Sequence, residues 1–115
     1  MYQPPRRTAL SMQRYARNDS LVVAVEGELD AQTLAPLQQA LEQAAATQQV
    51  VVFDASAVSF ADSSTLNLLL QTHRTTTLRI AGAQPQLLRV LQMTGADAAL
   101  ALFPTVTDAC KAVAS

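Results

Sequence analysis

Short apolar runs alternate with longer amphipathic runs along this sequence, and this pattern predicts alternating strands and helices. Residues 50–53 are apolar without a polar break, which is typical of a strand covered on both faces. Residues 11–17 alternate weakly and predict an edge strand, whereas β-branched side chains in residues 21–25 predict a stronger one. Further strands are expected at 78–81 and, more weakly, at 99–103.

Two helices are expected between these strands. The first opens near Thr33 as its N-cap, with Pro36 in the first turn, where the missing N–H removes no helical bond. The second runs from about Ser63 to His73. Leucines three or four positions apart give both helices a buried face: Leu34, Leu37, Leu41, Leu66, Leu69 and Leu70.

Two more helices are expected in the C-terminal third of the chain. Pro85 suits the first turn of one, and Gly95 is placed to end it. The last follows Thr105, which forms a capping-box-like pair with Asp108. The order β-β-α-β-α-β-α-β-α predicts an α/β fold. Its sheet is mixed and mainly parallel, with an N-terminal hairpin strand and about four helices.

Loops at the ends of the strands carry the candidate chemistry, because functional groups in parallel α/β folds gather at the C-terminal ends of strands. Gly27 is expected to end the second strand, and a loop of small residues over 54–62 to follow the third. This loop enters the second helix through Asp62, Ser63 and Ser64. At least one of these residues is expected to cap the helix. A serine hydroxyl in a first helical turn also suits a phosphate, since free N–H groups and the helix dipole offset its charge.

Composition places these elements in one domain of 115 residues with half its residues apolar. Residues 1–10 are expected to form a flexible N-terminal arm containing Arg6 and Arg7, and residues 11–115 the folded domain. A net charge of −1 gives no global field that would favour direct nucleic-acid binding. The sequence has neither the apolar region of a signal peptide nor an apolar segment long enough to span a membrane. The protein is therefore expected to be cytoplasmic, with no membrane partner.

Catalytic and metal-binding patterns are not apparent. His73 is the single histidine and lies near a predicted helix end, where a surface or capping role is expected. Cys110 stands alone in a helical pattern and is expected to be a buried small hydrophobe. Neither metal-ligand spacing nor a glycine-rich phosphate loop is present, so we expect no enzyme and no cofactor.

The segment 54–64, with the pattern Asp-x-Ser-x-Val-x-Phe-x-Asp-Ser-Ser, resembles the signature of STAS-domain anti-sigma factor antagonists. Gly-Glu-Leu-Asp at 27–30, together with Thr33, is similar to the second motif of that family. Met-Thr-Gly at 93–95 is similar to the end of its third helix. The resemblance covers roughly residues 11–112 and implies a STAS domain.

The resemblance implies a phosphorylation switch. In that family the second serine of Asp-Ser-Ser is the phosphoacceptor, which corresponds to Ser64. The unphosphorylated antagonist binds an anti-sigma factor serine kinase and thereby releases a sigma factor. Phosphorylation prevents this binding, and a PP2C-type phosphatase reverses it. The residues expected to border the phosphosite and the partner surface are Asp62, Ser63, Thr65, Asp30 and Thr33.

Two departures from the family pattern affect this expectation. Thr65 stands where the family usually has glycine, so its side chain occupies a spot that lets the kinase approach, and it is a second candidate acceptor. The stretch 66–78 is shorter than usual by about one helical turn.

Two alternative functions remain open. The first is a STAS scaffold or accessory module of a stressosome-like or transporter-associated complex, in which Ser64 is not a kinase substrate. The second is a small-molecule-binding or catalytic domain, which would require a closed, partly apolar pocket. Whether the chain forms a homodimer is also left open.

Overall fold

The computed structural model describes residues 11–112, so the arm predicted at 1–10 lies outside the described residues. The described residues form a five-stranded sheet in which strands adjacent in sequence are adjacent in space. β1 and β2 are antiparallel, and the remaining neighbours are parallel. The strands are β1 (Ser11–Arg17), β2 (Ser20–Leu29), β3 (Val50–Ala61), β4 (Thr77–Ala81) and β5 (Ala101–Phe103).

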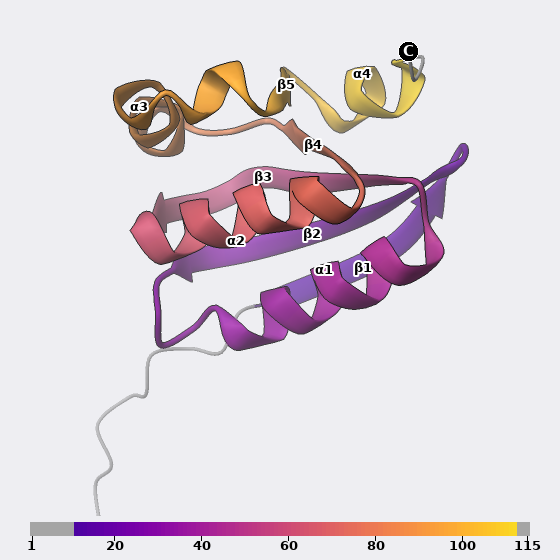
Figure 1. Cartoon of the computed structure of the whole chain (residues 1–115), viewed down its shortest axis with the longest axis horizontal. Helices are drawn as coiled ribbons and strands as arrows, with labels where there is room; N and C mark the ends of the chain where they lie inside the picture. Colours follow the sequence, from indigo (N-terminus) through magenta and orange to yellow (C-terminus); the bar gives the residue numbers. More distant parts are fainter. Residues whose placement is uncertain (1–10, 113–115) are drawn as a thin grey trace, which may run out of the picture.

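Within residues 11–112, four α-helices accompany the sheet, and they confirm the predicted α/β class (Figure 1). They are α1 (Ala35–Thr47), α2 (Ser63–Thr75), α3 (Pro85–Thr94) and α4 (Val106–Lys111). Buried residues of α1, α2 and α3 share one large core with one face of the sheet. The predicted leucine stripes lie in this core, with Leu70 only partly buried at its margin.

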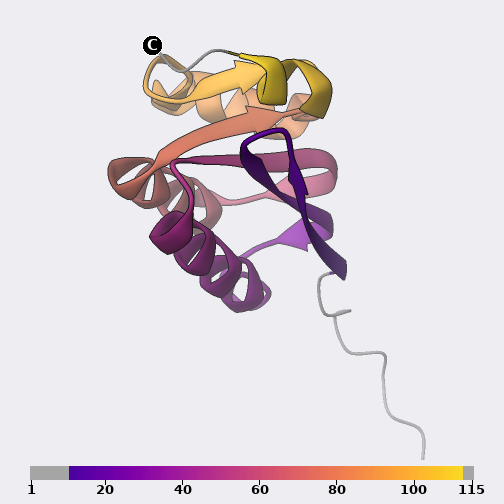
Figure 2. The same ribbon diagram turned by 90° about the vertical axis from the view of Figure 1, so that its right-hand side faces the viewer.

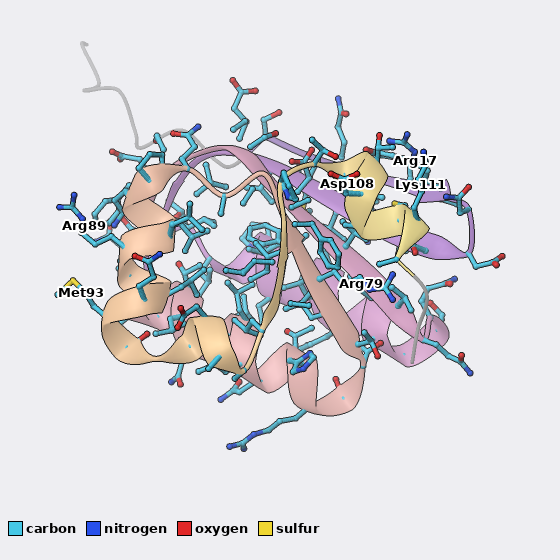
Figure 3. All side chains as sticks on the ribbon, turned by 90° about the horizontal axis from the view of Figure 1, so that it is seen from above. Arg17, Arg79, Arg89, Met93, Asp108 and Lys111 are labelled. Atoms are coloured by element: carbon cyan, nitrogen blue, oxygen red, sulfur yellow. The ribbon has the colours of Figure 1, made fainter. Side chains whose placement is uncertain are left out.

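The other face of the sheet carries a smaller core under α4, which Figure 2 shows on the side of the sheet away from α1 and α2. Cys110 is buried there beside Ala109, as predicted. Two arginines bond to α4 from different strands (Figure 3). Arg79, only 5% exposed, donates from Nη1 to the Ala109 carbonyl at 2.8 Å, and Arg17 donates to the Thr107 hydroxyl at 2.8 Å.

β2 and β3 continue well beyond the predicted strands. Gly27 does not end β2, and the stretch predicted as a loop after residue 53 remains a strand to Ala61. The two strands pair up to Leu29 and Ala61, with register shifts between Ala24 and Glu26 and again after Gly27. These irregularities bury every third residue of β3 instead of every second (Ala55, Val58 and Ala61), so the alternation that marks a strand in sequence is lost.

Helix boundaries differ from the expectation at three places. α1 begins at Ala35, and its N-cap is Leu34, which makes no side-chain cap bond; Thr33 is therefore not the N-cap. Pro36 does lie in the first turn. α2 continues two residues past His73. A 3-10 helix at Ala96–Ala98 shortens the final strand relative to the predicted 99–103.

Three glycines of the described residues have positive φ, and two of them, Gly82 and Gly95, should respond differently to alanine. Gly95 has φ of 78° and ends α3 as predicted, with open space where a Cβ would stand. Gly82 has φ of 68°, and an added Cβ would lie 3.0 Å from the Ser56 Cβ. We expect Gly95→Ala to cost about 1 kcal/mol through backbone strain alone, and Gly82→Ala about 1–2 kcal/mol more through the added clash. Urea unfolding measures both, and equal losses would contradict the predicted contact.

Candidate functional site

The Asp-Ser-Ser segment lies where β3 passes into α2, at the C-terminal end of the strand. Asp62 is the N-cap, with an extended backbone, and its Oδ1 accepts a hydrogen bond from the Thr65 N–H at 3.1 Å. The Asp62 N–H donates to the Leu29 carbonyl at the end of β2 at 3.2 Å. The predicted cap is confirmed, and the cap residue is also tied to the neighbouring strand.

Ser63 and Ser64 occupy the first two helical positions. Ser63 is exposed and Ser64 half-buried. The Ser64 hydroxyl makes no hydrogen bond to any residue in 11–112, and in that range no buried side-chain oxygen lacks a partner. The Ser64 oxygen is therefore reached by solvent. Its modification would break no contact within the described part of the chain.

The backbone around Ser64 favours negative charge. Thr65 N–H is bonded to the Asp62 carboxylate, and Leu66 N–H to the Asp62 carbonyl at 3.2 Å. The N–H groups of Ser63 and Ser64 have no acceptor among the described residues, as is usual in a first helical turn. These free donors and the positive end of the dipole of this 13-residue helix can offset an anion carried by Ser64.

Thr65 points into the protein and not toward a partner. Its side chain is completely buried, with 0% exposure. The hydroxyl donates to the Leu29 carbonyl at 3.2 Å and lies 3.4 Å from the Asp62 carboxylate. The expectation that Thr65 contributes to a partner-facing surface, or serves as a second acceptor, therefore does not fit the structure. If this hydroxyl turned outward, the buried Leu29 carbonyl would lose a hydrogen bond, which would cost free energy.

The second predicted motif forms a tight loop between β2 and α1. The Asp30 carboxylate accepts from the N–H groups of Gln32 at 2.9 Å and Thr33 at 3.1 Å. The Thr33 hydroxyl donates to the Glu28 carbonyl at 2.8 Å and accepts from the Asp30 N–H at 3.0 Å. Both side chains are half-buried and fix their own loop.

One carbonyl joins the two motifs. The Leu29 oxygen accepts from both the Asp62 N–H and the Thr65 hydroxyl, and Leu29 is paired with Ala61 in the sheet. The loop that contains Asp30 therefore lies beside the start of α2. The structure thus gathers all the sequence-predicted site residues at the C-terminal ends of β2 and β3. Of the hydroxyl groups on Ser64 and Thr65, only that of Ser64 opens to solvent.

Sequence reasoning missed two glutamines at the start of α3. Gln86 bonds to the backbone of Ala61, and Gln84 bonds to the carbonyl of Ser56. Neither belongs to a motif, and both contacts link residues at least 25 positions apart. Phe60 belongs to the motif, but its 42% exposure beside the site is set by the irregular strand and was not predicted.

Other kinds of chemistry find little support in the described residues. His73 Nδ1 accepts from the Leu78 N–H at 3.2 Å, so this histidine has a structural contact near the end of α2. Among residues 11–112, no three His, Cys, Asp or Glu side chains could together hold a metal ion. No helix in the same range has the length and apolarity to cross a membrane. A hollow of about 730 Å³ is lined by residues 45–49 and 73–77, at the opposite end of the sheet from Ser64.

Comparison with known families identifies the fold. The STAS domain family matches residues 11–109, and the chain therefore belongs to the STAS domain family. The structure is similar to an anti-sigma factor antagonist from Mycobacterium paratuberculosis, at 30% sequence identity and a TM-score of 0.81. The match covers 88% of this chain and 91% of that chain. A search of curated protein sequences finds no match.

Two further solved structures share the fold at lower identity. One is the Bacillus cell fate determinant SpoIIAA in its phosphorylated form, at 19% identity and a TM-score of 0.66, covering 88% of this chain and 96% of that chain. The other is the STAS domain of a SulP transporter from Vibrio cholerae, at 19% identity and a TM-score of 0.62, covering 84% of this chain and 80% of that chain.

Proposed function

We propose that this chain is an anti-sigma factor antagonist that is inactivated by phosphorylation of Ser64. The observation that carries the proposal is the solvent-open, unbonded Ser64 hydroxyl in the first turn of α2. The hydrogen bond from the Thr65 N–H to the Asp62 carboxylate fixes this turn. The Ser64 hydroxyl itself makes no hydrogen bond within the described residues. The 30% identity to an anti-sigma factor antagonist over nearly the whole chain supports the same function.

Phosphate on Ser64 would act through surface charge. It adds about 1.5 to 2 negative charges. The helix N-terminus tolerates this charge, and no bond among the described residues has to break to make room for it. The domain therefore keeps its fold, while a partner docked over the start of α2 meets a bulky anion that its surface does not match.

This mechanism defines the partners. In its unphosphorylated form the chain binds an anti-sigma factor serine kinase, so that the sigma factor is released. The kinase transfers the γ-phosphoryl group of ATP to the Ser64 oxygen, with release of ADP and the hydroxyl proton, and this ends the interaction. A PP2C-type phosphatase hydrolyses the phosphoester to inorganic phosphate and so restores the hydroxyl. Asp62 lies two residues before the acceptor, and its carboxylate is already committed to the Thr65 N–H. We therefore assign Asp62 the role of holding the acceptor turn.

Phosphosite mapping tests the proposal. The full chain is incubated with a candidate anti-sigma serine kinase and magnesium ATP, and phosphopeptides are sequenced by mass spectrometry. We expect a single phosphate on Ser64, none in Ser64→Ala, and normal labelling in the matched control Ser63→Ala. Stable binding of the kinase without any phosphorylation would favour the alternative of a non-switching STAS scaffold. Label on Ser63 would overturn the site.

A further inference from the structure

The last part of β3 has a strand on one side only. In the described sheet, β4 pairs with β3 up to Ala81 opposite Asp54, so residues 55–61 have β2 on one side and no strand on the other. Two glutamine side chains from the start of α3 fill part of this free edge. The first is Gln84, whose Nε2 donates to the Ser56 carbonyl at 2.7 Å.

The second, Gln86, reproduces the pair of bonds that a neighbouring strand would supply. Its Oε1 accepts from the Ala61 N–H at 2.9 Å, and its Nε2 donates to the Ala61 carbonyl at 3.0 Å. An amide side chain has one acceptor and two donor hydrogens, so a single glutamine can satisfy both backbone groups of one residue. Ala61 is the residue immediately before the N-cap of α2.

The peptide group between Ala61 and Asp62 is consequently held at both ends. Its carbonyl accepts from Gln86, and its N–H donates to the Leu29 carbonyl. Because this peptide group leads directly into the cap, its orientation determines whether the Asp62 carboxylate reaches the Thr65 N–H. Rotation of the peptide would move the cap and with it the first turn of α2.

We propose that Gln86 is a positioning residue for the Asp62–Ser63–Ser64 turn, through which α3 controls the geometry of the acceptor hydroxyl. Gln86 lies in the first turn of α3, and α3 packs on the core through the buried Leu87 and Leu91. This packing fixes the position from which the Gln86 amide reaches Ala61. The effect on Ser64 phosphorylation rests on the proposed function, whereas the effect on the turn does not.

Hydrogen exchange followed by NMR tests the positioning role on the full chain. In Gln86→Met, which keeps the length of the side chain but loses both bonds, we expect exchange of the Ala61 amide to rise about tenfold. The decisive amides are those of Asp62 and Thr65, whose N–H groups donate to Leu29 and to the Asp62 carboxylate and not to Gln86, and their exchange should also accelerate. Gln84→Met is the matched control and should leave these two amides within about twofold of the wild-type rate.

A second variant and a kinetic measurement complete the test. Gln86→Glu keeps an acceptor for the Ala61 N–H at neutral pH but cannot donate to the Ala61 carbonyl, so the Asp62 amide should again exchange faster. With the kinase, both Gln86 variants should lower kcat for Ser64 several-fold while KM stays within about twofold.

Acceleration confined to Ala61, or equal acceleration in Gln84→Met, would overturn the positioning role. Absence of phosphate on wild-type Ser64 would instead sink the proposed function and leave the exchange result standing.

Discussion

Ser64→Asp is expected to weaken binding of the anti-sigma kinase by about 100-fold or more while leaving the domain as stable as the wild type. The stability follows from the structure, because the Ser64 hydroxyl makes no bond within the described residues. A carboxylate in the first turn of a helix interacts favourably with the free N–H groups and the dipole, by about 0.3–1 kcal/mol. The loss of binding follows from an unmatched charge in a docked surface, which costs about 2–5 kcal/mol when it is buried without a partner.

Titration calorimetry with the purified kinase measures the loss of affinity, and urea unfolding measures the stability. Ser64→Ala should bind at least as tightly as the wild type, since it carries no charge and cannot be phosphorylated. Ser63→Asp moves the same charge by one residue to an exposed position and should weaken binding much less. Equal losses in the two aspartate variants would show that the effect reflects overall charge and not the Ser64 position.

The fold was largely predictable because burial of its strands and helices imposes recognisable apolar patterns on the sequence. The run at 50–53 lies under helices on both faces of the sheet, and its continuous apolar side chains indicate a buried strand. The continuation of the strand to Ala61 has no such pattern, because register shifts between β2 and β3 place small and polar residues at irregular intervals. This stretch is a strand and not a loop because it pairs with β2. Such pairing with a strand distant in sequence leaves no local pattern that could predict it.

The site was predictable only in part, for a related reason. The position of Asp62 as a helix cap follows from local chemistry, and so does the first-turn place of Ser64. The direction of a hydroxyl does not. The Thr65 hydroxyl turns inward and donates to the Leu29 carbonyl, which also accepts from the Asp62 N–H, and that carbonyl comes from a strand 36 residues earlier. The Gln86 contact likewise depends on where α3 lies relative to the end of β3.

The same inward hydroxyl makes Thr65→Gly the most damaging substitution we expect near the site. It should lower the free energy of unfolding by about 2–3 kcal/mol, because it removes a fully buried methyl group and a hydrogen bond to the Leu29 carbonyl. Glycine also loses more backbone entropy than threonine when it enters a helix. Urea unfolding followed by circular dichroism measures the loss.

Two controls separate the contributions at this position. Thr65→Ser keeps the hydroxyl and loses only the methyl group, so it should cost about 1 kcal/mol. Thr65→Val keeps the shape and leaves the Leu29 carbonyl short of one donor, which should cost about 1–2 kcal/mol. A loss below about 0.5 kcal/mol in Thr65→Gly would mean that the hydroxyl contributes nothing to the fold. The Thr65 hydroxyl therefore adds a second hydrogen bond between the start of α2 and the end of β2, beside the one from the Asp62 N–H.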